Sequence, residues 1–388
     1  MTRRCSLMIV LLVCVAALTA GARAGDYAKW KNGPPDDEGF FPISVWLQNP
    51  ARAARYKEAG INTYVGLWRG PTAQQLADLK EAGMKVICHQ NKAGLEYADD
   101  PTIIGWMHGD EPDNAQSLGP GKGYGPPIAP EKIVDGYRRI READPTRPVL
   151  LNLGQGVAWD GWHGRGVRTN HPEDYPQYVK GCDIASFDIY PAAHDKPQVA
   201  GNLWYVAKGV ERLVQWTEGK KPVWNCIECT RIHNPNRKAT PHEVRCEVWM
   251  SIIHGSMGLI YFVHEWEPRF NESALLSDSG MLSAVTAVNK RIAELAPVLN
   301  SPTIAGGAAV SSDNNAVPIA SMVKKHAGAT YVFAVAMRGD KAIATLTLQG
   351  LGGERAVEVI GENRIITSQD GVFKDSFGPW DVHLYRIQ

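Results

Sequence analysis

Eight short apolar runs alternate with helix-like segments as far as residue 300, and this alternation limits the possible folds more than any other feature. The runs are almost continuously apolar, which is typical of parallel strands covered on both faces. Eight strands alternating with helices predict an α/β fold, a (β/α)8 TIM barrel. The runs are Phe41–Trp46, Ile61–Trp68, Met84–His89, Ile103–Glu111, Pro148–Asn152, Cys182–Tyr190, Pro222–Glu228 and Gly258–His264.

The segments between these runs carry helix start and stop signals. Thr72 is placed to cap a helix that Gly83 ends. After the third run the helix is expected to be short or missing, because Asp99-Asp100-Pro101 follows quickly. The predicted helices are Ala51–Ala59, Thr72–Ala82, Pro130–Ala143, Val199–Thr217, Pro241–His254 and Gly280–Leu299.

The pattern changes after Ser301, where short strand-like segments are separated by glycine-containing turns. We therefore expect a barrel domain over residues 25–300 and a small C-terminal antiparallel β domain, a sandwich, over 301–388. This domain carries no recognisable chemistry, so it is expected to pack against the barrel, with sugar binding as the alternative. Its predicted strands are Val317–Val323, Thr330–Met337, Ala342–Leu348, Ala356–Ile360 and Val382–Ile387.

The N-terminus reads as a secretory signal peptide over residues 1–24. Arg3 and Arg4 precede an apolar stretch, Leu7–Leu18, and Ala22-Arg23-Ala24 fits a small-residue cleavage site. The stretch is too short for a comfortable membrane span, and no cysteine follows it where a lipoprotein anchor needs one. The chain is therefore expected to be exported, to the periplasm or the medium.

Charge and cysteine content exclude some classes of protein. The chain has 41 basic and 41 acidic residues, and loss of Arg3, Arg4 and Arg23 leaves 38 against 41. Such a balance attracts neither nucleic acid nor a membrane surface. Five cysteines remain, an odd number that leaves at least one free thiol. A Cys229–Cys246 disulfide and a redox or zinc role for Cys226-Ile-Glu-Cys229 both stay open. No cofactor and no metal is expected.

Two glutamates fall where apolar strands should stop, namely Glu111 and Glu228. Active sites of such barrels lie at the C-terminal ends of the strands, so both side chains are expected at one mouth. Two carboxyl groups flanking one bond are what glycosidic cleavage needs. For either glutamate alone, the competing interpretation is a buried partner of a nearby Arg or Lys.

Other residues near strand ends are candidates for substrate contact. Tyr190 is expected to hydrogen-bond Glu228 and keep it ionised. Asp110 could accept a sugar hydroxyl or cap the following turn. The tryptophans at strand ends either stack on sugar rings or simply pack, and most of the remaining polar residues are expected only to hydrogen-bond within the protein. The further candidates are Trp266, Trp68, Trp46, His108, Asn91, Asn152, Asp188, His264 and Glu265.

Two long segments follow strands on the predicted catalytic side, Pro112–Ala129 and Gly154–Tyr178. Loops of this length inside a compact domain are usually functional, so we interpret them as walls of a cleft.

The motifs resemble those of clan A glycoside hydrolases, which are (β/α)8 enzymes. Gly109-Asp110-Glu111-Pro112 is similar to the clan's strand-four Asn-Glu-Pro, Ile227-Glu228 to its strand-seven glutamate, and Tyr190 to its tyrosine beside the nucleophile. Trp249–Phe262 and Phe377–Tyr385 resemble the strand-eight entry and the end of the accessory β domain. The resemblance covers nearly all of the exported chain and assigns no family within the clan.

The resemblance implies a retaining mechanism on a β-linked poly- or oligosaccharide. Glu228 would attack the anomeric carbon while Glu111 protonates the leaving oxygen and later acts as base. Asp110 replaces the usual Asn, and an ionised Asp can only accept a hydrogen bond, which puts recognition of the sugar 2-hydroxyl in doubt.

Two rival functions stay open at this stage. One is a non-catalytic barrel that binds carbohydrate on its aromatic side chains. The other is a metal-dependent hydrolase using His89, His108, Asp188 and His264, although no His-x-His on strand one and no HExxH motif supports it.

Overall fold

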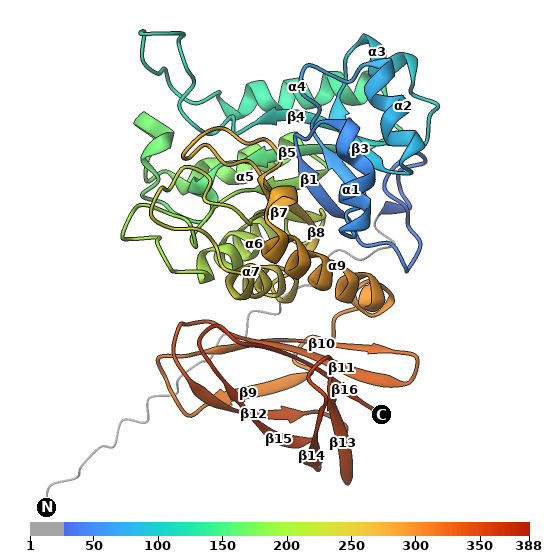
Figure 1. Cartoon of the computed structure of the whole chain (residues 1–388), viewed down its shortest axis with the longest axis vertical. Helices are drawn as coiled ribbons and strands as arrows, with labels where there is room; N and C mark the ends of the chain where they lie inside the picture. Colours follow the sequence, from blue (N-terminus) through green and yellow to red (C-terminus); the bar gives the residue numbers. More distant parts are fainter. Residues whose placement is uncertain (1–26) are drawn as a thin grey trace, which may run out of the picture.

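A computed structural model describes residues 27–388 as a closed barrel of eight parallel strands followed by an eight-stranded antiparallel sheet (Figure 1). The predicted signal peptide, residues 1–24, lies outside the described residues. The predicted TIM barrel is confirmed, with strands β1 to β8 neighbouring one another in sequence order. They are β1 Ile43–Trp46, β2 Thr63–Val65, β3 Lys85–His89, β4 Ile103–Asp110, β5 Val149–Leu153, β6 Ile184–Phe187, β7 Val223–Glu228 and β8 Ser256–Phe262.

The barrel interior is a packed apolar core rather than a channel. Alternate residues of the strands point inward, so Trp224 and Cys226 of β7 lie in one cluster with Leu150 and Ile260. Residues before β1 complete this cluster: the Tyr27 hydroxyl accepts a hydrogen bond of 2.8 Å from Trp224 Nε1. Because Trp224 lies at the start of β7, this contact closes the end of the barrel opposite the strand C-termini.

Capping residues fix the helices that surround the barrel. Thr72 and Gln75 form the capping box of α2, and Thr240 and Glu243 form that of α7. The helix after β3 is short, as expected, while the one predicted from Val199 begins only at Trp204. The helices are α1 Ala53–Glu58, α2 Ala73–Glu81, α3 Lys92–Glu96, α4 Pro130–Ala143, α5 Tyr175–Tyr178, α6 Trp204–Trp216, α7 Pro241–Ile253, α8 Ala274–Ser277 and α9 Ser279–Leu299.

The C-terminal sheet has its own apolar core, and its edge strands β9 and β10 come into contact, so the sheet curls over that core (Figure 1). Five strands were predicted here and eight are formed; β9, β14 and β15 were not predicted. The strands are β9 Ala308–Ser312, β10 Ile319–His326, β11 Ala329–Ala336, β12 Ala342–Leu348, β13 Glu354–Val359, β14 Arg364–Gln369, β15 Val372–Phe377 and β16 Val382–Ile387.

Helices α7 and α9 lie between the barrel and this sheet (Figure 1). Trp249 of α7 stacks on Phe333 of β11, with ring centroids 5.7 Å apart. The Arg245 guanidinium donates to the carbonyl of Val382 at 2.9 Å. The expected packing of the β domain against the barrel is therefore present.

Cys88, Cys182, Cys226, Cys229 and Cys246 are all buried and free. The Cys229–Cys246 disulfide that the sequence left open is therefore not formed, and burial raises the pKa of the Cys229 thiol. Within residues 27–388, no helix combines the length and apolar character needed to cross a membrane.

Candidate active site

Glu111 begins the turn that follows β4, at the C-terminal mouth of the barrel, and its backbone is strained. Its φ is +43°, a left-handed conformation that is uncommon for a residue with a side chain. The Glu111 N–H donates to the carbonyl of Asn152 on β5 at 2.9 Å, which holds the turn against the neighbouring strand. Nine other described non-glycine residues also have a positive φ, so this strain marks Glu111 as a candidate only together with its position at a strand end.

The carboxyl group of Glu111 is enclosed by other acids and by an amide. It lies within hydrogen-bonding reach of Asp188 and of Asn114. Burial, together with the negative charges of Asp110 and Asp113, raises the pKa of Glu111 to about 8. The Glu111–Asp188 pair therefore holds at least one proton at neutral pH, and the form with that proton on Glu111 is the state required of a general acid.

Gly154, directly after β5, leaves the space that this carboxyl group occupies. A Cβ atom at residue 154 would lie 2.8 Å from Glu111 Oε1 and 2.9 Å from the side-chain amide of Asn114. The site thus depends on a glycine that belongs to a different strand end.

Asp188 follows β6 and is the nearest acidic partner of Glu111. It is buried, and its Oδ1 has no hydrogen-bond partner within the described part of the chain. The Tyr190 hydroxyl lies 3.5 Å from Asp188 Oδ2, a long hydrogen bond. Burial and the adjacent Glu111 raise the pKa of Asp188 well above its ordinary value. Two carboxyl groups this close share protons because both cannot be ionised cheaply.

A network of polar side chains from β4, β5 and β6 lies next to the Glu111–Asp188 pair. Asn152 of β5 donates to Asp110 Oδ1 at 3.0 Å and accepts from the Ser186 hydroxyl of β6 at 3.0 Å. Asp110 is exposed at the mouth. The protein atoms around its carboxyl group nevertheless displace part of its hydration, and this desolvation raises the pKa of Asp110 to about 6. Because water also reaches this carboxyl group, we expect its charge to be better screened than that of Glu111.

Asp113 anchors the turn that carries Glu111. It is fully buried, and its two oxygens accept from Gly154 N–H at 2.9 Å and from the Tyr175 hydroxyl at 2.8 Å. The loop after β4 is therefore tied to both ends of the 154–178 segment.

Glu228, the second glutamate expected at the mouth, is sealed from solvent with 0% exposure. Its two oxygens accept hydrogen bonds from the N–H groups of Ala192, at 2.6 Å, and Ala193, at 2.7 Å. The hydroxyl of Tyr190 donates to Asp188, so the expected bond from Tyr190 to Glu228 is not formed. The carboxyl group instead clamps the loop after β6, beside a β6–β7 ladder that pairs only Ala185 with Val223.

Beneath Glu228 lies a second buried acid, Glu247 of α7, also 0% exposed. Neither oxygen of Glu247 accepts a hydrogen bond from any group in the described chain, yet its carboxyl group is within hydrogen-bonding reach of Glu228. Burial raises the pKa of both acids, and the charge of Glu228 raises that of Glu247 further. Because two N–H groups point at Glu228 and none at Glu247, we place the shared proton on Glu247.

An aromatic pocket opens on the side of the mouth formed by the ends of β1, β2 and β8. It encloses about 620 Å³ and includes Trp68, Trp266 and Phe270. Trp68 is 65% exposed and Trp266 42%, so flat ring faces are available to solvent. His264 also lines this pocket, and its Nε2 is buried without a hydrogen-bond partner in the described chain.

Three other candidates serve the fold. Trp46 is 6% exposed and belongs to the barrel core. Asn91 caps α3, accepting from Gly94 N–H at 2.8 Å and donating to the Pro71 carbonyl at 2.9 Å. His108 turns away from the mouth toward α4, where its Nε2 lies 3.0 Å from the carbonyl oxygen of Ile133.

The structure thus gathers Asp110, Glu111, Asn152 and Tyr190 around Asp188, and it gathers Trp68 and Trp266 in a separate pocket. The sequence indicates Asp188 only as one polar residue among several near strand ends, although it follows β6 as Glu111 follows β4. The roles of Asp113 and Gly154 have no comparable sequence signal. Within residues 27–388, no group of three or more His, Cys, Asp or Glu side chains is arranged to hold a metal ion.

Comparison with known proteins establishes the architecture. No protein-family model matches the sequence, and no curated protein matches it. An α-amylase from Anoxybacillus has a similar structure, with a TM-score of 0.54 and 12% identity over 90% of this chain and 98% of that one. AmyP in complex with maltotriose is also similar, with a TM-score of 0.53 and 8% identity over 90% and 97% of the two chains. The chain therefore belongs to the class of TIM-barrel proteins with a C-terminal β domain, a fold shared with these two proteins.

Proposed function

We propose that this protein is an exported glycoside hydrolase that acts on a β-linked poly- or oligosaccharide, with Glu111 as the proton donor. One observation carries the proposal: a strained glutamate at the barrel mouth whose surroundings raise its pKa to about 8. A neutral carboxylic acid in that position can protonate a glycosidic oxygen as the bond to the anomeric carbon breaks. The aromatic pocket and the use of this fold by an α-amylase support glycoside hydrolysis, whereas the β-linkage rests on the clan resemblance alone.

The second carboxyl group of the reaction has two candidates. Asp188 is favoured by geometry, because it lies within hydrogen-bonding reach of Glu111 and no backbone N–H group of the described chain donates to it. Glu228 is favoured by the clan resemblance, but both of its oxygens are occupied by backbone N–H groups. Attack by Glu228 would require the Ala192–Ala193 segment to move.

The distance between the two carboxyl groups decides the stereochemical outcome. Retention needs about 5–5.5 Å between them and inversion needs roughly 6.5–9.5 Å. Glu111 and Asp188 are within hydrogen-bonding reach in the free protein, so a bound sugar must separate them. We propose that this separation produces the retaining geometry.

A panel of β-linked polysaccharides, with products sized by chromatography, tests the proposal. Wild-type protein should release oligosaccharides, Glu111→Gln should not, and Asp188→Asn should lose more activity than Glu228→Gln. Full turnover by Glu111→Gln would overturn the assignment of the proton donor. A greater loss of activity in Glu228→Gln than in Asp188→Asn would assign the nucleophile role to Glu228.

A second candidate is a non-catalytic carbohydrate-binding barrel, favoured by the enclosure of Glu228. It predicts binding to a polysaccharide with no product released, and with Glu111→Gln binding as well as the wild type. The same panel therefore separates the two functions.

A further inference from the structure

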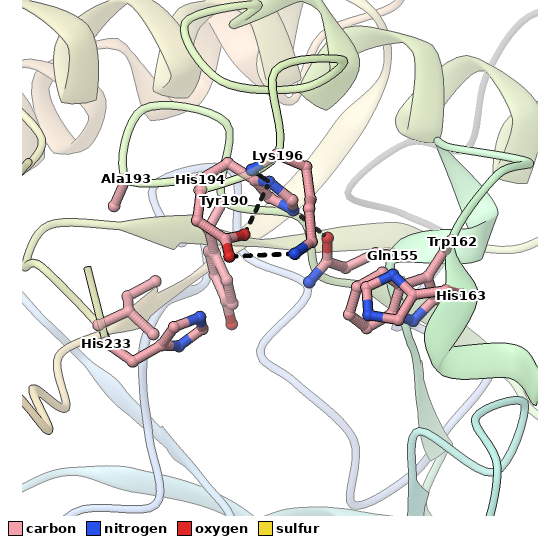
Figure 2. Close-up of a pocket in the computed structure, with 10 residues that line it drawn as sticks. Gln155, Trp162, His163, Tyr190, Ala193, His194, Lys196 and His233 are labelled. Atoms are coloured by element: carbon pink, nitrogen blue, oxygen red, sulfur yellow. Dashed lines mark hydrogen bonds and ion pairs between the residues drawn. The ribbon is translucent and has the colours of Figure 1, made fainter.

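A second pocket lies at the mouth of the barrel, next to the aromatic pocket: Ile232 lines it, and its carbonyl accepts a hydrogen bond from the N–H of Trp266 at 2.6 Å. Its lining comes from the segments that follow β5, β6 and β7, and its volume is about 130 Å³ (Figure 2). It includes Tyr190, whose hydroxyl reaches Asp188, and Trp162, whose Nε1 donates to Asn114 Oδ1 at 2.8 Å. Since Asn114 in turn contacts Glu111, Tyr190 and Trp162 connect the pocket to both members of the acid pair, although neither acid lines it.

A chain of hydrogen bonds fixes which polar atoms face this pocket. The N–H of Lys196 donates to His194 Nδ1 at 3.0 Å, so Nδ1 carries no proton. His194 must then donate from Nε2 to Gln155 Oε1, at 2.9 Å, because burial lowers the pKa of His194 and keeps the ring neutral. The oxygen of Gln155 is thereby occupied, which leaves the amide N–H groups of this pocket-lining residue for other partners (Figure 2).

The remaining groups include one charged donor and two imidazole rings that can each donate a hydrogen bond. Lys196 brings an ammonium group, and the exposed rings of His163 and His233 lie on opposite sides of the pocket (Figure 2). The opposing charge is Asp195, whose side chain is 53% exposed and whose Oδ2 lies 3.3 Å from Lys196 Nζ. A donor-rich site around a lysine fits a ligand group that only accepts hydrogen bonds and carries negative charge.

We propose that this pocket binds a sugar unit bearing an acidic substituent, a carboxylate or a sulfate, next to the bond that is cleaved. The substituent takes the place of Asp195 on Lys196 and accepts hydrogen bonds from the Gln155 amide. The inference rests on the proposed function, since it names the substrate class of the same site.

Two substitutions of opposite sign test the proposal. Gln155→Glu keeps the acceptor for His194 but replaces the N–H donors with a carboxylate oxygen, so affinity for an acidic sugar should fall about tenfold or more. Asp195→Asn removes the competing charge, so affinity should rise severalfold. Lys180→Met, an exposed lysine at the other end of β6, is the control and should change nothing.

Binding is measured by titration calorimetry on full-length Glu111→Gln protein, in which turnover is not needed. The probes are matched oligosaccharides that are neutral, uronic or sulfated. Tighter binding of an acidic probe, with the two shifts above, supports the inference, and the better of the two acidic probes identifies the substituent. Equal binding of neutral and acidic probes, or a preference unchanged by Gln155→Glu, overturns it. An acidic preference without any cleavage by wild-type protein would retain the pocket and reject the hydrolase.

Discussion

Two pairs of buried carboxyl groups lie near the C-terminal ends of the barrel strands, and they are built differently. Glu111 and Asp188 meet at the mouth, on a strained turn, with an oxygen of Asp188 left unpartnered in the described chain. Glu228 and Glu247 meet between β7 and α7, and Glu228 is satisfied by two backbone N–H groups. A strand end therefore places a carboxyl group near the mouth, but hydrogen bonding decides whether it is free to react.

The largest expected effect separates the pairs by activity. Glu111→Gln keeps the size and hydrogen bonding of the side chain but removes the transferable proton. We expect turnover of a good polysaccharide substrate to fall by about 10²–10⁴-fold with the thermal midpoint nearly unchanged. Initial rates and calorimetric melting on the same preparation check this. An equal loss in Glu247→Gln would show that the two pairs do not differ in role.

The next effect separates them by stability. Glu228→Ala leaves the N–H groups of Ala192 and Ala193 without acceptors, which should lower the free energy of unfolding by about 3 kcal/mol. Glu247→Gln should cost less than about 1 kcal/mol, because the amide can still donate to Glu228. Denaturant titration of both variants measures the difference. A Glu228→Ala protein as stable as the wild type would show that the hydrogen bonds from Ala192 and Ala193 to Glu228 do not stabilise the fold.

A smaller effect concerns the space around Glu111. Gly154→Ala places a Cβ 2.8 Å from Glu111 Oε1, so the carboxyl group must shift, and we expect turnover to fall roughly tenfold. Gly109→Ala is the matched control, because its Cβ would meet nothing within 4 Å. Steady-state kinetics on both variants decide the point, and equal rates would show that the mouth tolerates displacement of Glu111.

The smallest effect is on pH dependence. The pKa of Glu111 is raised from its ordinary value of 4.5 to about 8, so the folded protein binds this proton more strongly than the unfolded chain does. The resulting stability is complete below pH 4.5 and is lost as the pH rises through 8. We expect Glu111→Gln to flatten the decline between pH 5 and 8 by on the order of 1 kcal/mol, after allowance for solvent screening at the mouth. Denaturant unfolding of both proteins across that range measures it; parallel curves would contradict the raised pKa.

The sequence by itself determined the architecture. Continuous apolar runs, capping residues such as Thr72 and Thr240, and the change of pattern after Ser301 were enough to predict the barrel and the β domain. Local patterns suffice for this because the apolar run that predicts a buried strand and the residues that cap a helix each lie within one short segment of the chain. The strands β9, β14 and β15 were not predicted from the same patterns.

Only the tertiary structure decided the chemistry at the strand ends. In the sequence, Glu111 and Glu228 occupy equivalent positions at strand ends. In the structure, the N–H groups of Ala192 and Ala193 bind the carboxyl group of Glu228, whereas the end of β6 brings Asp188 to Glu111. Proton affinity and access to solvent depend on groups that are far apart in sequence and meet only when the barrel closes. That dependence on long-range contacts is the physical reason why a strand-end glutamate can be recognised from the sequence while its role cannot.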